Sequence, residues 1–288
     1  MAKKMKVRHG RKRSGSAKDF LLILIIVLIL ASLIAGIAYV FLNREKIDTN
    51  TADLCPKQGA RATVAILLDT TDQISKATKR DIQKRARYEL ENLPRYYRLS
   101  LYTMSDQGLD LAPEMTQCNP GKLTEMSKLA QKGITANPRM IKEKYDAFAA
   151  NISRATNKAL NTTFDGKQSP LLSALQELSS NLPEPVVLDA DLYPAGRNKI
   201  IYITDLMEHT DVFSIYRDGN NMKNFQDSSA TEKYRKKYTE DLEFWVIKRK
   251  VPGTNTREIM DFWGNILIKE FGFPPQQNLN MLSLDGET

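Results

Sequence analysis

The chain has 288 residues, 42% of them hydrophobic, and a formal net charge of +8. Residues 1–18 contain eight lysines and arginines and no acidic residue, so residues 19–288 sum to zero. The net positive charge therefore comes from residues 1–18 alone. It is no evidence for a nucleic-acid-binding surface on the rest of the chain. We therefore expect no specific nucleic acid partner; a nucleic-acid-binding tail is the alternative.

Residues 20–42 form one apolar segment without a charged side chain. A helix of this length spans roughly 30 Å, which is the thickness of the hydrocarbon core of a lipid bilayer. No convincing cleavage site follows, so we interpret the segment as an uncleaved transmembrane helix rather than a signal peptide. The basic residues 1–19 are then a cytoplasmic tail whose side chains contact anionic lipid head groups.

Residues 43–288 are accordingly expected in the periplasm or outside the cell. They contain the two cysteines of the chain, Cys55 and Cys118. Because that environment is oxidising, an even number of cysteines suggests one disulfide bond, with two free thiols as the alternative. No histidine lies near these cysteines, which argues against a zinc site.

The polar residues 43–60 are predicted to be a stalk that follows the membrane helix. Residues 62–69 are a continuous apolar run, which indicates a strand buried on both faces. In residues 77–93 the apolar side chains recur every third or fourth position, which predicts a helix with one buried stripe. The next strand is expected at residues 98–104.

Residues 105–165 interrupt this alternation of strands and helices. They begin with a turn-rich stretch and then show an apolar stripe that predicts a helix near residues 138–160. We interpret the segment as an insertion or a long crossover. Ser169 and Pro170 follow, and a serine at the N-cap with a proline at the first helical position predicts the start of the next helix.

Two further strands are expected at residues 198–205 and 242–248, with a long loop at 206–240 between them. A final helix ends at residue 272, and the tail at 273–288 is left unassigned. The alternation predicts an α/β domain over residues 61–272, Rossmann-like and doubly wound around a mainly parallel sheet. A single transmembrane helix precedes this domain.

Two of the predicted strands end in an aspartate, Asp69 and Asp205, and ligands of such sheets bind beyond the carboxyl ends of the strands. Thr71 and Asp72 follow the first aspartate, and Ser169 precedes a helix. Carboxylate and hydroxyl oxygens suit Mg²⁺. Each residue also has a plainer interpretation. Asp69 or Asp72 would cap the next helix, Ser169 its own helix, and Asp205 would serve a turn.

Taken together, the order and spacing of these residues resemble the von Willebrand factor type A family. The first metal-binding motif of that family, Asp-x-Ser-x-Ser, is similar to Asp69 and Thr71, whereas Gln73 departs from its third position. The family's threonine before a helix is similar to Ser169, and its second aspartate is similar to Asp205. The resemblance implies a metal-ion-dependent adhesion site in which Mg²⁺ or another divalent cation receives a carboxylate from a partner protein.

Asp72 would replace the ligand that Gln73 cannot give, directly or through a water molecule. The resemblance therefore implies a metal site made of Asp69, Thr71, Asp72, Ser169 and Asp205.

Catalysis has less support in the sequence. His209 follows the third main strand, but no nucleophile elbow or phosphate-binding loop accompanies it. The loop at 206–240 also carries four aromatic residues, which either form a protein interface or pack on their own domain. These residues are Phe213, Tyr216, Phe225 and Tyr234.

We therefore expect a single-pass membrane protein with a cytoplasmic N-terminus. Its extracytoplasmic domain would bind protein partners, without catalysis, as a component of a membrane-associated assembly. One alternative is an extracytoplasmic metal-dependent hydrolase that uses Asp69, Asp72 and Asp205. Another alternative is a structural subunit whose metal site has decayed.

Overall fold

The computed structural model describes residues 17–42, 47–125, 137–162, 166–249, 255–274 and 276–284. Most of the basic tail and the last four residues lie outside these ranges. The described residues fall into two units, an N-terminal helix and a folded domain that begins at Ile47. Each unit is described by itself.

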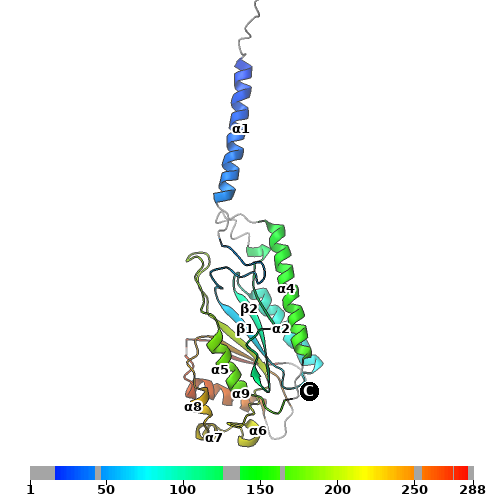
Figure 1. The fold of residues 1–288 in the computed structure, drawn as a ribbon, viewed down its shortest axis with the longest axis vertical. Helices are drawn as coiled ribbons and strands as arrows, with labels where there is room; N and C mark the ends of the chain where they lie inside the picture. Colours follow the sequence, from blue (N-terminus) through cyan, green and yellow to red (C-terminus); the bar gives the residue numbers. More distant parts are fainter. Residues whose placement is uncertain are drawn as a thin grey trace, which may run out of the picture. The chain divides into compact units, whose positions relative to one another are not determined.

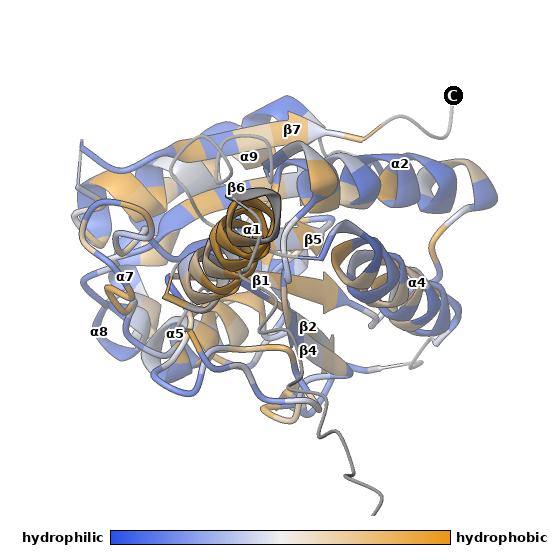
Figure 2. Cartoon of the chain, turned by 90° about the horizontal axis from the view of Figure 1, so that it is seen from above, coloured by the Kyte–Doolittle hydropathy of each residue, from blue (hydrophilic) through white to orange (hydrophobic). Residues whose placement is uncertain are grey.

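The N-terminal helix, α1, runs from Ala17 to Leu42. Its segment from Phe20 to Tyr39 has a mean hydropathy of 3.3 and is exposed along its length. Figure 2 shows this helix in the colour of hydrophobic residues along most of its length. By length and composition, α1 is therefore sufficient to cross a membrane.

The folded domain is built around one mixed sheet, which confirms the predicted α/β class. In the described part of the chain its order is β3-β2-β1-β5-β6-β7, and β4 also pairs with β2. The strands β1, β2, β5, β6 and β7 are mutually parallel, whereas β3 and β4 run antiparallel to β2. The strand bounds are β1 Thr63–Asp69, β2 Arg98–Ser105, β3 Gly108–Leu109, β4 Met115–Cys118, β5 Lys199–Thr204, β6 Asp241–Val246 and β7 Leu279–Ser283.

Two of these features were not predicted from the sequence. The segment expected as an insertion at 105–165 begins with β3 and β4, which extend the sheet at the edge of β2. The tail left unassigned contains β7, which pairs with β6 and continues the parallel sheet past residue 272. Residues 47–60, expected as a stalk, include the buried Cys55 and Ala60.

Helices cover both faces of the sheet (Figure 1). Successive residues of β1 alternate between two hydrophobic clusters, since Ala65 and Leu67 pack with α5 and α9, while Ile66 and Leu68 pack with α2 and α4. A strand buried on both faces is expected to read as a continuous apolar run. The helix bounds are α2 Lys76–Asn92, α4 Pro138–Asn161, α5 Leu171–Asn181, α6 Ile215–Asp218, α7 Met222–Asp227, α8 Ala230–Tyr234 and α9 Thr256–Asn265.

The predicted helices at 77–93 and 138–160 are confirmed as α2 and α4. The prediction of a loop over 206–240 is wrong in part, because α6, α7 and α8 occupy much of it. These helices are only four to six residues long. They are too short to show the recurrence of apolar residues every three or four positions that identifies a helix in a sequence. The last helix, α9, continues as a π-helical turn over Ile266–Glu270, and Gly272 follows with a φ of +64°.

A disulfide bond joins Cys55 and Cys118, as the cysteine count suggested, with the two Cα atoms 4.7 Å apart. Both cysteines are buried against Ala60. The amide of Cys118 also donates to the carbonyl of Asp53, at 2.8 Å. The bond therefore fastens the first residues of the domain to the antiparallel edge of the sheet.

Candidate functional site

The carboxyl end of β1 holds Asp69 in a buried turn. The amide and the hydroxyl of Thr71 both donate to Asp69 Oδ1, at 3.0 Å and 2.7 Å. The hydroxyl of Thr204, the last residue of β5, donates to Asp69 Oδ2 at 3.1 Å. Both oxygens of the carboxyl group are therefore fixed, one from the turn after β1 and the other from β5. Neither Asp69 nor Asp72 caps α2, because Ser75 is its N-cap and accepts from the amide of Thr78.

Asp205 follows the end of β5 and is oriented by a constrained turn. Leu206 has a φ of +63°, which is unfavourable for a residue with a bulky side chain. Its amide donates to Thr204 Oγ1 at 3.0 Å, and its carbonyl accepts from the indole of Trp263 in α9 at 2.8 Å. The amide of Met207 donates to Asp205 Oδ1 at 2.9 Å. The two strand-end aspartates are thus held at the same edge of the sheet.

Ser169 brings a third segment to this edge, with its hydroxyl 3.5 Å from that of Thr71. The prediction that Ser169 is the N-cap of α5 is wrong. Pro170 occupies that position without a side-chain cap, and the amide of Leu172 donates instead to Glu208 Oε2, at 2.8 Å. The Ser169 backbone exchanges two hydrogen bonds with His209, at 2.8 Å and 3.0 Å. Its hydroxyl is therefore placed beside Thr71 rather than over the helix end.

These side chains form the strand-end cluster, defined as Asp69, Thr71, Ser169, Thr204 and Asp205. Four of the five predicted site residues belong to it, all of them buried, and Thr204 is an addition that the sequence did not indicate. The fifth predicted residue, Asp72, lies at the exposed rim, where 51% of its side chain is accessible.

An arginine reaches the same edge from the neighbouring strand. Arg249 follows β6 by three residues, and its Nε forms an ion pair with Asp205 Oδ2. Its Nη2 lies 3.2 Å from Asp72 Oδ2. One guanidinium group therefore joins a buried carboxylate to an exposed one. The arginine side chain itself is only 26% exposed.

Burial and mutual repulsion raise the pKa values of the acidic groups near this edge. Burial, with the negative charge of Asp205, raises the pKa of Asp69 to about 7. Burial also raises the pKa of Asp205, although Arg249 opposes this effect. Burial raises the pKa of Glu208 to about 8, despite the Leu172 amide that favours its ionised form. At neutral pH the strand-end cluster therefore carries less negative charge than its composition indicates.

The rim beside the cluster presents one exposed aromatic side chain. Tyr216 in α6 is 52% exposed, and its ring packs edge-on against His209, with the centroids 5.4 Å apart. His209 Nδ1 is in turn 2.7 Å from the hydroxyl of Ser214. The other three aromatic residues considered for an interface, Phe213, Phe225 and Tyr234, are buried in the domain core. For those three, packing on their own domain is the correct interpretation.

The residue types at this edge suit a divalent cation, but their arrangement does not leave them free for one. The two hydroxyls of Thr71 and Ser169 converge, as ligands of one ion would. The carboxylates of Asp205 and Asp72, however, are both paired with Arg249. Gln73 is exposed. No group of three or more acidic, histidine or cysteine side chains suited to a metal occurs among the described residues.

Arg249 and Glu208 were missed by reasoning from sequence. Arg249 lies in the basic run "KRK" directly after a predicted strand, so the rule that placed Asp69 and Asp205 at one edge applies to it equally. Glu208 carries no such signal, because its partner is a backbone amide 36 residues away in the chain.

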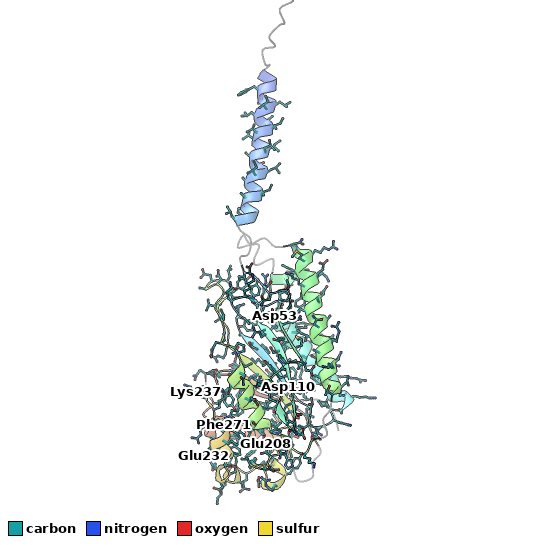
Figure 3. All side chains as sticks on the ribbon, viewed as in Figure 1. Asp53, Asp110, Glu208, Glu232, Lys237 and Phe271 are labelled. Atoms are coloured by element: carbon teal, nitrogen blue, oxygen red, sulfur yellow. A yellow bond between two sulfur atoms is a disulfide. The ribbon has the colours of Figure 1, made fainter. Side chains whose placement is uncertain are left out.

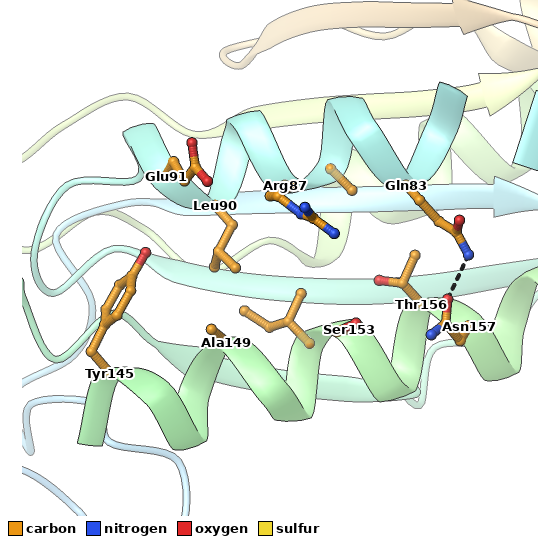
Figure 4. Close-up of a pocket in the computed structure, with 11 residues that line it drawn as sticks. Gln83, Arg87, Leu90, Glu91, Tyr145, Ala149, Ser153, Thr156 and Asn157 are labelled. Atoms are coloured by element: carbon orange, nitrogen blue, oxygen red, sulfur yellow. Dashed lines mark hydrogen bonds between the residues drawn. The ribbon is translucent and has the colours of Figure 1, made fainter. Parts of the chain in front are cut away.

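A separate groove lies between α2 and α4, with a volume of about 480 Å³. Figure 4 shows Tyr145 and Glu91 at one end of the groove and the hydrogen bond from Gln83 to Asn157, 2.7 Å long, toward the other. Leu90 and Ile152 are among its apolar lining. None of its lining residues belongs to the strand-end cluster.

Comparison with known proteins found distant structural similarity but no family. No protein-family model matches the chain, and no curated protein matches its sequence. Three solved structures are similar at low identity, and the chain spans between 41% and 59% of their lengths.

The first is the proximal thread matrix protein 1 from the mussel byssus, with 10% identity, 71% of this chain and 41% of that chain covered, and a TM-score of 0.36. The second is a von Willebrand factor type A protein from Catenulispora acidiphila, with 9% identity and a TM-score of 0.33. The match covers 74% of this chain and 43% of that chain. The third is a mutant of the PilB minor pilin from Streptococcus sanguinis, with 13% identity, 80% and 59% covered, and a TM-score of 0.41.

Proposed function

We propose that the chain is a non-enzymatic, membrane-anchored binding protein. Its domain binds a partner protein at the carboxyl edge of the sheet, as a component of a membrane-associated assembly. The observation that carries this proposal is the position of Tyr216, which is exposed and packs against His209, the backbone partner of Ser169 in the strand-end cluster. Tyrosine is enriched at protein interfaces and among the residues that contribute most to binding there.

The anchor and the orientation are part of the same proposal. The helix α1 spans the membrane, the basic tail stays in the cytoplasm, and the domain lies in the periplasm or outside the cell. The disulfide bond between Cys55 and Cys118 supports this orientation, because such bonds persist in oxidising compartments. The anchored domain would then meet partners at or near the membrane surface.

The exposed tyrosine provides a direct test of the binding surface. The full-length chain is tagged, extracted from its own membrane in mild detergent, and its co-isolated proteins are quantified by mass spectrometry. We expect Tyr216→Ala to reduce the co-isolated partner about tenfold or more, as for a side chain at the centre of an interface. Tyr88→Ala, at a tyrosine of α2 that is 66% exposed, should leave the partner unchanged. Equal recovery with both variants would contradict the proposal.

A metal-dependent hydrolase is the second candidate, because the buried Asp69 and Asp205 lie at the carboxyl ends of the adjacent parallel strands β1 and β5, where ligands of such sheets bind. Turnover of a generic phosphoester by the purified full-length chain, lost on Asp205→Ala, would establish this alternative. The non-enzymatic proposal predicts no turnover above that of the variant.

A further inference from the structure

We infer that Arg249 is the resident cation of the strand-end cluster, and that its side chain takes the place of a divalent metal ion. Removing it would uncover a latent metal site. This inference goes beyond the proposed binding function and does not depend on the identity of any partner.

The fold gathers charged side chains at this edge of the sheet. Three neighbouring strands, β1, β5 and β6, end here. The first two supply Asp69 and Asp205, and β6 leads to Arg249. Two buried carboxyl groups at one sheet edge repel each other and are costly without a nearby positive charge. Among the described residues, Arg249 is the cation that ion-pairs with Asp205, and it also pairs with Asp72 at the exposed rim.

Arg249 contacts carboxylate oxygens that the sequence predicted to be metal ligands. It pairs with Asp205 and Asp72, which were two of the three carboxylates predicted to hold the metal. A guanidinium group has five donors in a fixed plane and stays charged at all accessible pH values, so it can bridge two carboxylates without dehydrating a metal ion. The guanidinium contacts one oxygen of each carboxylate, and its fixed positive charge repels a second cation such as Mg²⁺ at this edge.

Without the arginine side chain, several oxygen ligands would remain at this edge. Asp205 would be left as a buried carboxyl group, 4% exposed at its side chain, and no other described residue forms an ion pair with it. The hydroxyls of Thr71 and Ser169 already converge at 3.5 Å, and Asp69 is fixed by three hydrogen bonds. Oxygens of these types are the ligands that Mg²⁺ and Mn²⁺ take in proteins. The vacated edge would therefore bind a divalent cation.

Thermal unfolding of the full-length chain in detergent tests this inference. Melting temperatures are compared in a chelator and in MgCl₂ or MnCl₂, with NaCl added to equalise ionic strength. We expect no shift for the unmodified chain. Arg249→Ala should melt at a lower temperature in the chelator and gain about 5–10 °C at a metal concentration a hundredfold above its Kd.

Two further variants make the result specific. Arg249→Lys keeps a positive charge at the edge and should show no metal-dependent gain. Arg249→Ala combined with Asp205→Asn should lose the gain that Arg249→Ala shows. A metal-dependent shift in the unmodified chain as large as that in Arg249→Ala would overturn the inference, as would the absence of any gain in Arg249→Ala.

If Arg249→Ala does not fold in the chelator, Arg249→Gln prepared with and without Mn²⁺ replaces it. Recovery of folded protein only with Mn²⁺ supports the inference, and equal recovery contradicts it. A failure here would leave the co-isolation experiment on Tyr216 unaffected, so the two proposals fail separately.

Discussion

Glu208 shows how a single buried side chain takes over a role that local sequence assigns elsewhere. The pair Ser169 and Pro170 has the pattern of a helix start, yet the cap of α5 comes from Glu208, which lies beyond the end of β5. A carboxylate at a helix N-terminus is favourable electrostatically. Its burial has the opposite effect on its ionisation and raises its pKa to about 8.

This raised pKa leads to a prediction about stability and pH. The ordinary pKa values of Glu208 and Asp69 are 4.5 and 3.8, and in the folded chain they are about 8 and about 7. Between these values the folded chain holds protons that the unfolded chain has lost, so the free energy of unfolding should fall as pH rises from about 5 to about 8. Glu208→Gln should reduce this slope, because the amide does not titrate.

Urea unfolding of the full-length chain in detergent at several pH values measures the slope. The matched control is Glu232→Gln, at an exposed glutamate of α8; both positions are labelled in Figure 3. The control should keep the slope of the unmodified chain. A Glu208→Gln variant with an unchanged slope would show that Glu208 is ionised in the folded state.

The sequence predicted which residues lie at the site better than it predicted the residues that they contact. Asp69, Thr71 and Asp205 lie together because β1 and β5 are parallel and end at the same edge, and Ser169 joins them through its backbone pairing with His209. Thr204, Glu208 and Arg249 were not predicted, because their contacts depend on register and side-chain direction across segments far apart in the chain. The divalent metal ion predicted from the sequence at this edge is untested, and our inference places Arg249 there instead.

At the scale of elements, long periodic segments were predictable and short ones were not. The strand β1 and the helices α2 and α4 have enough residues for burial to produce a clear period. The short helices α6, α7 and α8 and the strands β3, β4 and β7 do not. Their positions follow from tertiary contacts, such as the pairing of β7 with β6 at the sheet edge.

The disulfide bond is the element-level contact with the clearest energetic consequence. It closes a loop with a sequence separation of 63 residues between Cys55 and Cys118. Loss of a cross-link over such a loop should lower the free energy of unfolding by about 4 kcal/mol. A reducing agent should produce this loss in the unmodified chain, as measured by urea unfolding.

The variant Cys55→Ala combined with Cys118→Ala serves as the control, and its stability should not change when the reducing agent is added. If reduction leaves the unmodified chain as stable as before, the disulfide does not constrain the domain.

At the scale of the whole molecule, an apolar helix and a folded domain imply a division between membrane and water. The helix α1 has the length and composition of a membrane span. With lysine and arginine concentrated in residues 1–18, the N-terminus is expected on the cytoplasmic side. The domain, with its disulfide, is expected on the opposite side.

Protease protection tests this orientation. In sealed, right-side-out membrane vesicles, external protease should remove a tag placed after residue 288 and leave a tag placed before residue 1 intact. Detergent should make both tags accessible. Removal of the N-terminal tag in sealed vesicles would contradict the proposed orientation.

We propose that partner proteins bind at the carboxyl edge of the sheet and not at the groove between α2 and α4. A photo-reactive amino acid placed at position 216, in the full-length chain in its own membrane, measures this contact directly. We predict that it cross-links one discrete partner protein. The same amino acid at position 153, an exposed serine that lines the groove, should give no such product. A partner cross-linked from position 153 and not from position 216 would contradict the proposed binding surface.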